Sequence, residues 1–157
     1  MDKINSSIQE YTISNSNIAK AYFSFFLTSQ KITGKTESFL SYFNISNTQL
    51  SILLLLHSNE AFSETTSSIS KKLGLSVPTI SNVLSTLHKK KFIQKKTLPK
   101  DKRSTYVNLD KDGIDFLKKF IPLYKQKYEK LFSNFNINEL DNLKSLSLKV
   151  FFNLDDF

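Results

Sequence analysis

Cations gather in the middle of this 157-residue chain, beside a run of small polar residues. Residues 47–110 hold ten Lys and Arg against four acids, whereas the segments before and after them contribute only +1 each to the net charge of +8. A genome that favours lysine would explain why lysine is abundant, but it would not concentrate the surplus in one segment. A basic stretch between nearly neutral ends therefore indicates a polyanionic partner such as nucleic acid.

Side chains that catalyse reactions or hold metals are scarce by comparison. The chain has no cysteine, which excludes disulfides, thiolate metal sites and redox sensing by thiols. Its two histidines, His57 and His88, would need carboxylates to complete a metal site. No nucleophile–base pair, phosphate-binding loop or metal-ligand cluster is visible in the sequence. We therefore expect neither an enzyme nor a protein that carries a cofactor or a metal.

A helix suited to reading DNA is predicted from Ser76 to about Lys90. Gly74 is expected to end the preceding helix in a left-handed conformation, Leu75 to be buried in a tight turn, and Ser76 to cap the next helix. Small polar residues at the start of such a helix can approach base edges in a major groove, and cations at its end can approach phosphates. A solvated polar face without a ligand is the alternative. The face that we expect to contact DNA carries Ser76, Val77, Pro78, Thr79, Ser81, Asn82, Lys89 and Lys90.

Two strand-like segments, residues 92–97 and 104–109, follow this helix and predict a β-hairpin. The tip between them carries Lys100, Lys102 and Arg103, which could lie along a phosphate backbone or enter a minor groove, where arginine is favoured in narrow A·T tracts. Phosphate would repel Asp101, so we expect this acid to pair with Arg103 and to orient it. An exposed salt bridge worth ~0–1 kcal/mol is the alternative for this pair.

Apolar helices are predicted on both sides of the basic part. Aromatic and aliphatic residues recur at helical spacing in residues 15–45 and again in residues 111–154. These helices could pack within the chain or against a second copy. We favour a homodimer, because two-fold pairing matches a palindromic DNA site.

The expected fold is mostly α-helical with a small β-hairpin wing, a winged helix-turn-helix. We expect a single domain over residues 1–157, in which residues 47–110 bind DNA and the N- and C-terminal helices form the dimerisation part. No apolar run approaches the ~20 residues of a membrane span, and the N-terminus lacks the apolar core of a signal peptide. We therefore expect a cytoplasmic protein that does not contact a membrane.

Two segments together resemble the MarR family of bacterial winged-helix regulators. The first is LGLSVPTISNVLSTLHKKKFIQKK, and the second, PKDKRSTYVNLDKDG, is similar to the family's wing signature through Asp101, Arg103, Leu109, Asp110 and Gly113. The resemblance covers roughly residues 15–154 and implies a homodimeric transcriptional regulator, more often a repressor, that binds a palindromic, A·T-rich operator. It also implies release from DNA by a small ligand. We expect an aromatic or phenolic ligand near Tyr22, Phe26 and His57.

The sequence departs from the family at one position, and two other interpretations stay open. Lys91 stands where the family often has glycine before the first wing strand, which predicts strain at a left-handed residue. One alternative is a regulator of the staphylococcal SarA type, which has a similar wing and often no known ligand. The other is a protein-interaction module that has kept the fold and lost operator binding.

Overall fold

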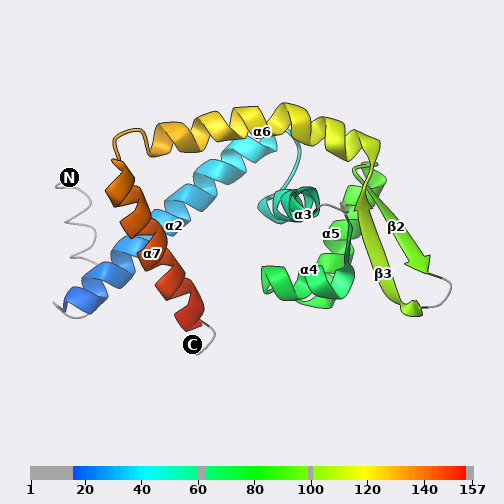
Figure 1. Cartoon of the computed structure of the whole chain (residues 1–157), viewed down its shortest axis with the longest axis horizontal. Coiled ribbons are helices and arrows are strands. Elements are labelled where there is room, and N and C mark those ends of the chain that lie inside the picture. The colour runs from blue at the N-terminus through cyan, green and yellow to red at the C-terminus, as the bar shows by residue number, and fades with distance from the viewer. Residues whose placement is uncertain (1–15, 60–62, 99–100, 155–157) are drawn as a thin grey trace. The chain divides into compact units, whose positions relative to one another are not determined.

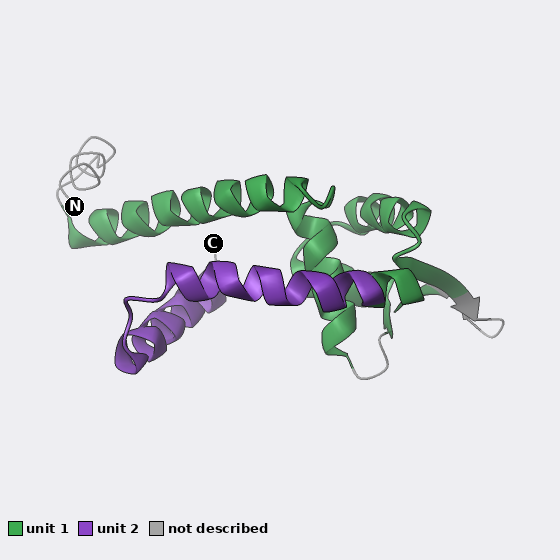
Figure 2. Cartoon of the chain, turned by 90° about the horizontal axis from the view of Figure 1, so that it is seen from above, with its two compact units in different colours: residues 1–114 green, residues 115–157 purple. Residues whose placement is uncertain are grey.

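The computed structural model describes residues 16–59, 63–98 and 101–154, and of residues 97, 98 and 101–104 it describes the backbone only. The chain divides into two compact units, residues 1–114 and 115–157 (Figure 2). Most of the first unit is helical, and its helices and strands follow one another along the chain (Figure 1). They are α2 (Asn17–Ser41), α3 (Asn47–Ser58), β1 (Ser63–Thr65), α4 (Thr66–Leu73), α5 (Val77–Lys89), β2 (Ile93–Leu98) and β3 (Asp101–Leu109).

Side-chain caps set where these helices begin. In each case a hydroxyl or amide oxygen accepts the backbone N–H three residues ahead, which satisfies one of the donors left unpaired in the first turn. The capping residues are Ser16, Ser46, Thr65 and Ser76 in the first unit and Asn136 in the second. Ser46 forms a full capping box with Gln49, and Asn136 forms another with Glu139.

Three helices of the first unit end in the same type of turn. The residue with positive φ is Asn44 (55°) after α2, Gly74 (64°) after α4 and Lys91 (59°) after α5. In each turn the next N–H donates to the carbonyl five residues back: Ile45 to Leu40 (3.3 Å), Leu75 to Ser70 (3.2 Å) and Phe92 to Leu87 (3.1 Å). Glycine and asparagine tolerate this backbone conformation, whereas lysine is strained in it. The predictions for Gly74 and Lys91 are confirmed.

A three-stranded antiparallel sheet replaces the two-stranded hairpin that we expected. Its strand order is β1-β3-β2, with Glu64 opposite Val107 on one side of β3 and Lys95 opposite the same residue on the other. We missed β1 because three polar residues, Ser-Glu-Thr, show no alternation of apolar and polar side chains. The hairpin itself is confirmed, and its strands extend closer to the tip than predicted.

One apolar core holds the first unit together. Its residues are less than 9% exposed, and each contributes roughly 1.5–3 kcal/mol through burial. They come from every helix of the unit and from β2 and β3: Leu40, Ile45, Leu50, Ile52, Leu53, Leu56, Ile69, Ile80, Leu84, Leu87, Ile93, Val107 and Leu109. Helix α5, which Figure 1 shows beside α4, contributes three of them and contacts α4 and β2. Its orientation is therefore set by the core.

Gly113 allows a close backbone approach where β3 leads into α6 (Lys111–Leu131). A Cβ at this position would lie 2.2 Å from the carbonyl oxygen of Phe92. The same oxygen accepts a hydrogen bond of 3.0 Å from the N–H of Asp110. Only glycine can occupy position 113 without displacing the backbone that follows α5.

The second unit contains most of α6 together with α7 (Ile137–Asn153). Helix α6 runs through Pro122, and it buries Leu117 and Phe120. Helix α7 has no buried residue, although apolar side chains recur along it. Among the helices that the structure describes, none has the length and hydropathy to span a bilayer.

Candidate nucleic-acid interface

Helix α5 buries one face and exposes the face that we expected to contact DNA. Ile80, Leu84 and Leu87 are at most 1% exposed, whereas the opposite side begins with Val77, which is 46% exposed. Pro78, Thr79, Asn82 and Lys89 are also exposed, and Ser81 is half-buried. No acidic residue stands in the first turn of the helix. A polar, acid-free helix start can approach a phosphate or a base edge without repulsion.

The turn before α5 is held by short polar contacts. The hydroxyl of Ser76 accepts the N–H of Thr79 at 3.3 Å and lies 2.8 Å from the Thr79 hydroxyl. The hydroxyl of Ser70 donates to the carbonyl oxygen of Leu75 at 2.5 Å. The predicted burial of Leu75 is wrong, because its side chain is 36% exposed. Hydrogen bonds to both backbone groups of Leu75 fix the turn, so its side chain is not needed as an anchor.

The other end of α5 is tied to the wing. A ring nitrogen of His88 lies 3.0 Å from the carbonyl oxygen of Ile93, the first residue of β2. The ammonium of Lys95 on β2 donates to the hydroxyl of Ser85 on α5 at 3.1 Å. The sequence alone did not indicate a role for Lys95. Its place opposite buried Val107 shows that it lies on the helix side of the sheet, and only the strand register could have indicated that.

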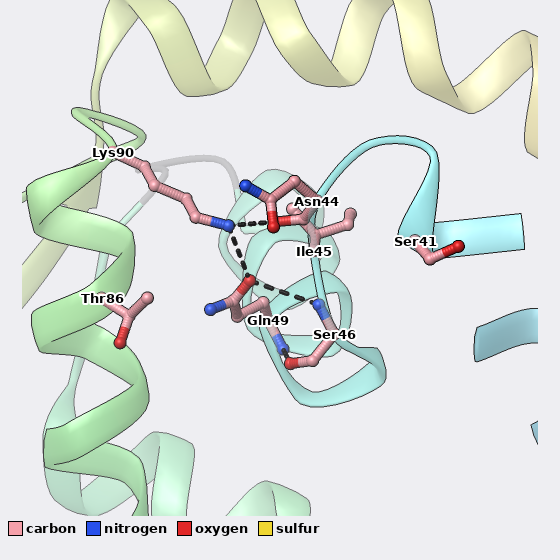
Figure 3. A pocket seen from close by; sticks show the side chains of 7 residues that line it. All are labelled: Ser41, Asn44, Ile45, Ser46, Gln49, Thr86 and Lys90. Atoms are coloured by element: carbon pink, nitrogen blue, oxygen red, sulfur yellow. Dashed lines mark hydrogen bonds between the residues drawn. The ribbon is translucent and has the colours of Figure 1, made fainter. Parts of the chain in front are cut away.

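Lys89 and Lys90 are neighbours in the chain but not in environment. Lys89 is exposed at the last turn of α5. Lys90 reaches back to the turn between α2 and α3, where its ammonium donates to the carbonyl oxygen of Asn44 and, at 3.3 Å, to Oε1 of Gln49 (Figure 3). These residues line a recess of about 450 Å³ together with Ser41, Ile45, Ser46 and Thr86. The structure does not bring Lys90 together with the rest of the expected DNA-contacting face.

The wing tip carries the remaining residues of the expected interface. Lys100 lies outside the residues that the structure describes, and so do the side chains of Asp101, Lys102 and Arg103. The backbone of Asp101 pairs with that of Leu98 across the hairpin. The expected pairing of Asp101 with Arg103 therefore stays a prediction.

An ion pair supports α4, the helix that precedes the turn. The ammonium of Lys72 donates to a carboxylate oxygen of Glu64, whose side chain is only 12% exposed. Hydrogen bonds from Lys72 and Ser68 hold the pKa of Glu64 below its ordinary value of 4.5. This pair connects the last turn of α4 to β1, so the helix that leads into the α4–α5 turn is joined to the sheet.

The residues of the expected ligand site lie on two helices. Tyr22 and Phe26 stack on α2 with ring centroids 6.0 Å apart, and they are 57% and 40% exposed. His57 is half-buried in the last turn of α3. None of the three lines the recess beside Lys90. A ligand site among them stays a prediction. Across the described part of the chain, no cluster of His, Asp or Glu could hold a metal ion.

Comparison with known proteins identifies similar chains. The model of the MarR family matches residues 45–105, which run from the start of α3 into the wing. The HTH-type transcriptional regulator YwaE of Bacillus subtilis is 31% identical over 128 residues, which cover 81% of this chain and 74% of YwaE. The transcriptional repressor MprA of Escherichia coli is 27% identical over 111 residues, 71% of this chain and 63% of MprA.

Solved structures share the arrangement of helices and strands. MepR of S. aureus, in its complex with DNA, is 26% identical, with a TM-score of 0.76 over 84% of this chain and 96% of MepR. Sco3205 of Streptomyces coelicolor, a MarR family regulator also solved with DNA, has a TM-score of 0.81 over 87% of this chain and 88% of that one. At 14% identity the second likeness shows the fold alone.

Proposed function

Because the chain belongs to the MarR family of transcriptional regulators, we propose that it represses transcription by binding duplex DNA as a homodimer. In this proposal the start of α5 enters a major groove, and the wing tip contacts the neighbouring minor groove or its phosphates. A regulator of this kind works where the chromosome is, so we expect it in the cytoplasm.

The observation that carries the proposal is the exposed start of α5. Its first turns present small polar and β-branched side chains without an acid, while its other face is buried in the core. Thr79 and Val77 offer methyl groups that suit thymine, and Asn82 offers an amide that suits adenine. Lys89 follows on the exposed side of the same helix, where a phosphate can be reached.

The helices outside the DNA-binding part support the proposed homodimer. Helix α7 exposes Leu146, Phe151 and Phe152 to 60–63%, and none of its residues is buried. Helix α2 exposes Ile18 and Tyr22 to 84% and 57%. Large exposed apolar side chains along a helix are typical of an interface. A two-fold dimer would present two copies of α5 and so match a palindromic site, A·T-rich where Arg103 enters a minor groove.

Titration of a fluorescent duplex from the region upstream of the protein's own gene tests this function. Each phosphate contact releases counterions, so log Kd should rise steeply and linearly with log salt. A scrambled duplex of the same composition is the control for sequence preference. A flat salt dependence, or equal affinity for both duplexes, would overturn the proposal.

Two substitutions assign the binding to its expected residues. Arg103→Ala and Asn82→Ala should each weaken binding by about 1–3 kcal/mol, with the dimer intact by size-exclusion chromatography. Lys144→Ala removes an exposed charge from outside the expected DNA-contacting residues and, with its dimer checked by the same chromatography, is the matched control. Loss of the dimer in either of the first two variants would contradict the assignment.

We also propose that a small aromatic or phenolic ligand releases the protein from DNA. The stacked, partly exposed rings of Tyr22 and Phe26 support this, since a third ring could extend the stack. Benzoate and phenol, added to the preformed complex, are the probes. Release by either one in the wild type, but not in Phe26→Ala with an intact dimer, is the expected result. No release by either probe would contradict the proposal.

A further inference from the structure

We infer that Lys90 is a positioning residue that fixes the C-terminal end of α5 to the turn between α2 and α3. The inference rests on the proposed DNA binding and changes the role of one lysine within it. Sequence position alone groups Lys90 with Lys89 as a cation for phosphate. The contacts of the two side chains separate them.

Lys90 joins segments that are more than 40 residues apart in the chain. Its ammonium donates to the backbone carbonyl of Asn44 and to Oε1 of Gln49 (Figure 3). The lysine stands at the C-cap of α5, and its own N–H donates to the carbonyl of Thr86 at 3.1 Å. The last turn of α5 is therefore held by its backbone and its side chain at once.

The two oxygens that accept from the Lys90 ammonium are held in place by the backbone turn after α2 and by the capping box of α3. Asn44 adopts the left-handed conformation that closes α2, and its carbonyl is the one that accepts from Lys90. Gln49 is only 8% exposed, and its Oε1 also accepts the N–H of Ser46 at 3.2 Å in the capping box of α3. One amide oxygen thus serves both the start of α3 and the end of α5. Hydrogen bonds to a charged donor are the stronger kind.

These hydrogen bonds connect α5, which we propose enters the major groove, to the end of α2, which we propose for dimerisation. Asn44 belongs to the turn that ends α2, and Gln49 belongs to the first turn of α3. Through the side chain of Lys90, the C-cap residue of α5, the end of this helix forms hydrogen bonds to both segments. Removal of the ammonium should therefore make the C-terminal end of α5 more mobile relative to the α2–α3 turn. DNA binding should then weaken although no phosphate contact is lost.

The salt dependence of DNA binding separates a positioning lysine from a phosphate ligand. Lys89→Met, the matched control, should weaken binding and lower the slope of log Kd against log salt by about two, which is about one for each protomer of the proposed dimer. Lys90→Met should weaken binding about tenfold, the equivalent of one charge-assisted hydrogen bond, and leave the slope unchanged. Lys90→Arg keeps donors at the same place and should restore most of the affinity. A slope lowered in Lys90→Met as in Lys89→Met would overturn the inference.

Hydrogen–deuterium exchange on the full chain without DNA gives a second, independent result. Lys90→Met should speed exchange in residues 44–50 as well as in residues 86–92, whereas Lys89→Met should leave residues 44–50 unchanged. Exchange in residues 44–50 that does not respond to Lys90→Met would overturn the inference. A wild-type protein without salt-dependent binding would instead overturn the proposed function, and exchange would still decide the role of Lys90.

Discussion

The two ends of α5 are built from similar turns but are held very differently. Before the helix, the turn at Gly74 is fixed by backbone hydrogen bonds and by Ser70 and Ser76, and the Leu75 side chain projects outward. After the helix, the turn at Lys91 is surrounded by longer-range contacts. They join His88 to Ile93, Lys95 to Ser85, Lys90 to Gln49 and the Phe92 carbonyl to Asp110.

This difference indicates which end of α5 carries function and which carries structure. The C-terminal end is anchored to β2, to the α2–α3 turn and to the start of α6. The conformation of the N-terminal end is fixed by local hydrogen bonds, and its side chains are mostly exposed. A helix start that enters a DNA groove must be exposed in this way. Apart from the exposed Lys89, substitutions that remove the C-terminal contacts should therefore cost stability and affect DNA binding only through the position of α5. Substitutions at the N-terminal end should cost stability and also remove direct contacts to DNA.

The largest expected effect is at Gly113, beneath the C-terminal turn. Gly113→Ala would place a Cβ 2.2 Å from the Phe92 carbonyl oxygen, so the backbone after α5 would have to move. We expect a loss of about 3 kcal/mol in the free energy of unfolding, measured by urea denaturation. Gly34→Ala is the matched control, because a Cβ there meets nothing within 4 Å and α2 should gain up to about 1 kcal/mol. Equal stability of the two variants would contradict this prediction, because it would show that the backbone at Phe92 can move aside at little cost.

Loss of the cap at the N-terminal end should have a smaller effect on stability and a specific effect on binding. Ser76→Ala removes the acceptor for the N–H of Thr79, and we expect a loss of about 1 kcal/mol in unfolding free energy. Ser16→Ala removes the corresponding cap of α2, outside the residues that Lys90 contacts, and is the control. Both should lower the melting temperature by a few degrees. Only Ser76→Ala should also weaken DNA binding, and equal loss of affinity in both would contradict the division between the two ends.

Replacement of Lys91 tests whether the C-terminal turn carries strain. Lys91→Gly relieves a left-handed lysine at φ 59° but adds freedom to the unfolded chain, so we expect a net gain of up to about 1 kcal/mol. Lys91→Ala loses the same charge and keeps the strained conformation. If the alanine variant is as stable as the glycine variant, electrostatic repulsion and not backbone strain explains the gain.

The features of α5 that depend on neighbouring residues could be predicted from the sequence, whereas those that depend on distant segments could not. The cap at Ser76 and the left-handed Gly74 are local features, and residues a few positions apart decide them. The partners of Lys90 and Lys95 depend on which distant segments meet. No local pattern in the Lys89–Lys91 run distinguishes an exposed lysine from one that contacts Gln49. Strand β1 was missed for the same reason, since only its pairing with β3 defines it.

The smallest expected effect concerns Glu64, which supports the N-terminal side through α4. Its folded-state pKa is lowered, mainly by the hydrogen bond from Lys72, so its contribution to stability is fully present above its ordinary pKa of 4.5. As the pH falls below that value towards the lower folded pKa, protonation removes the contribution. The wild type should thus lose more stability between pH 6 and pH 3 than Glu64→Gln in urea titrations.

Glu37→Gln, an exposed acid on α2 in the same unit, is the control for general charge effects on acid unfolding. Its pH dependence should follow that of the wild type. If Glu64→Gln also follows the wild type, the Lys72–Glu64 pair does not hold α4 to the sheet. The N-terminal turn of α5 would then depend more on its local hydrogen bonds, which makes the contrast with the anchored C-terminal end larger.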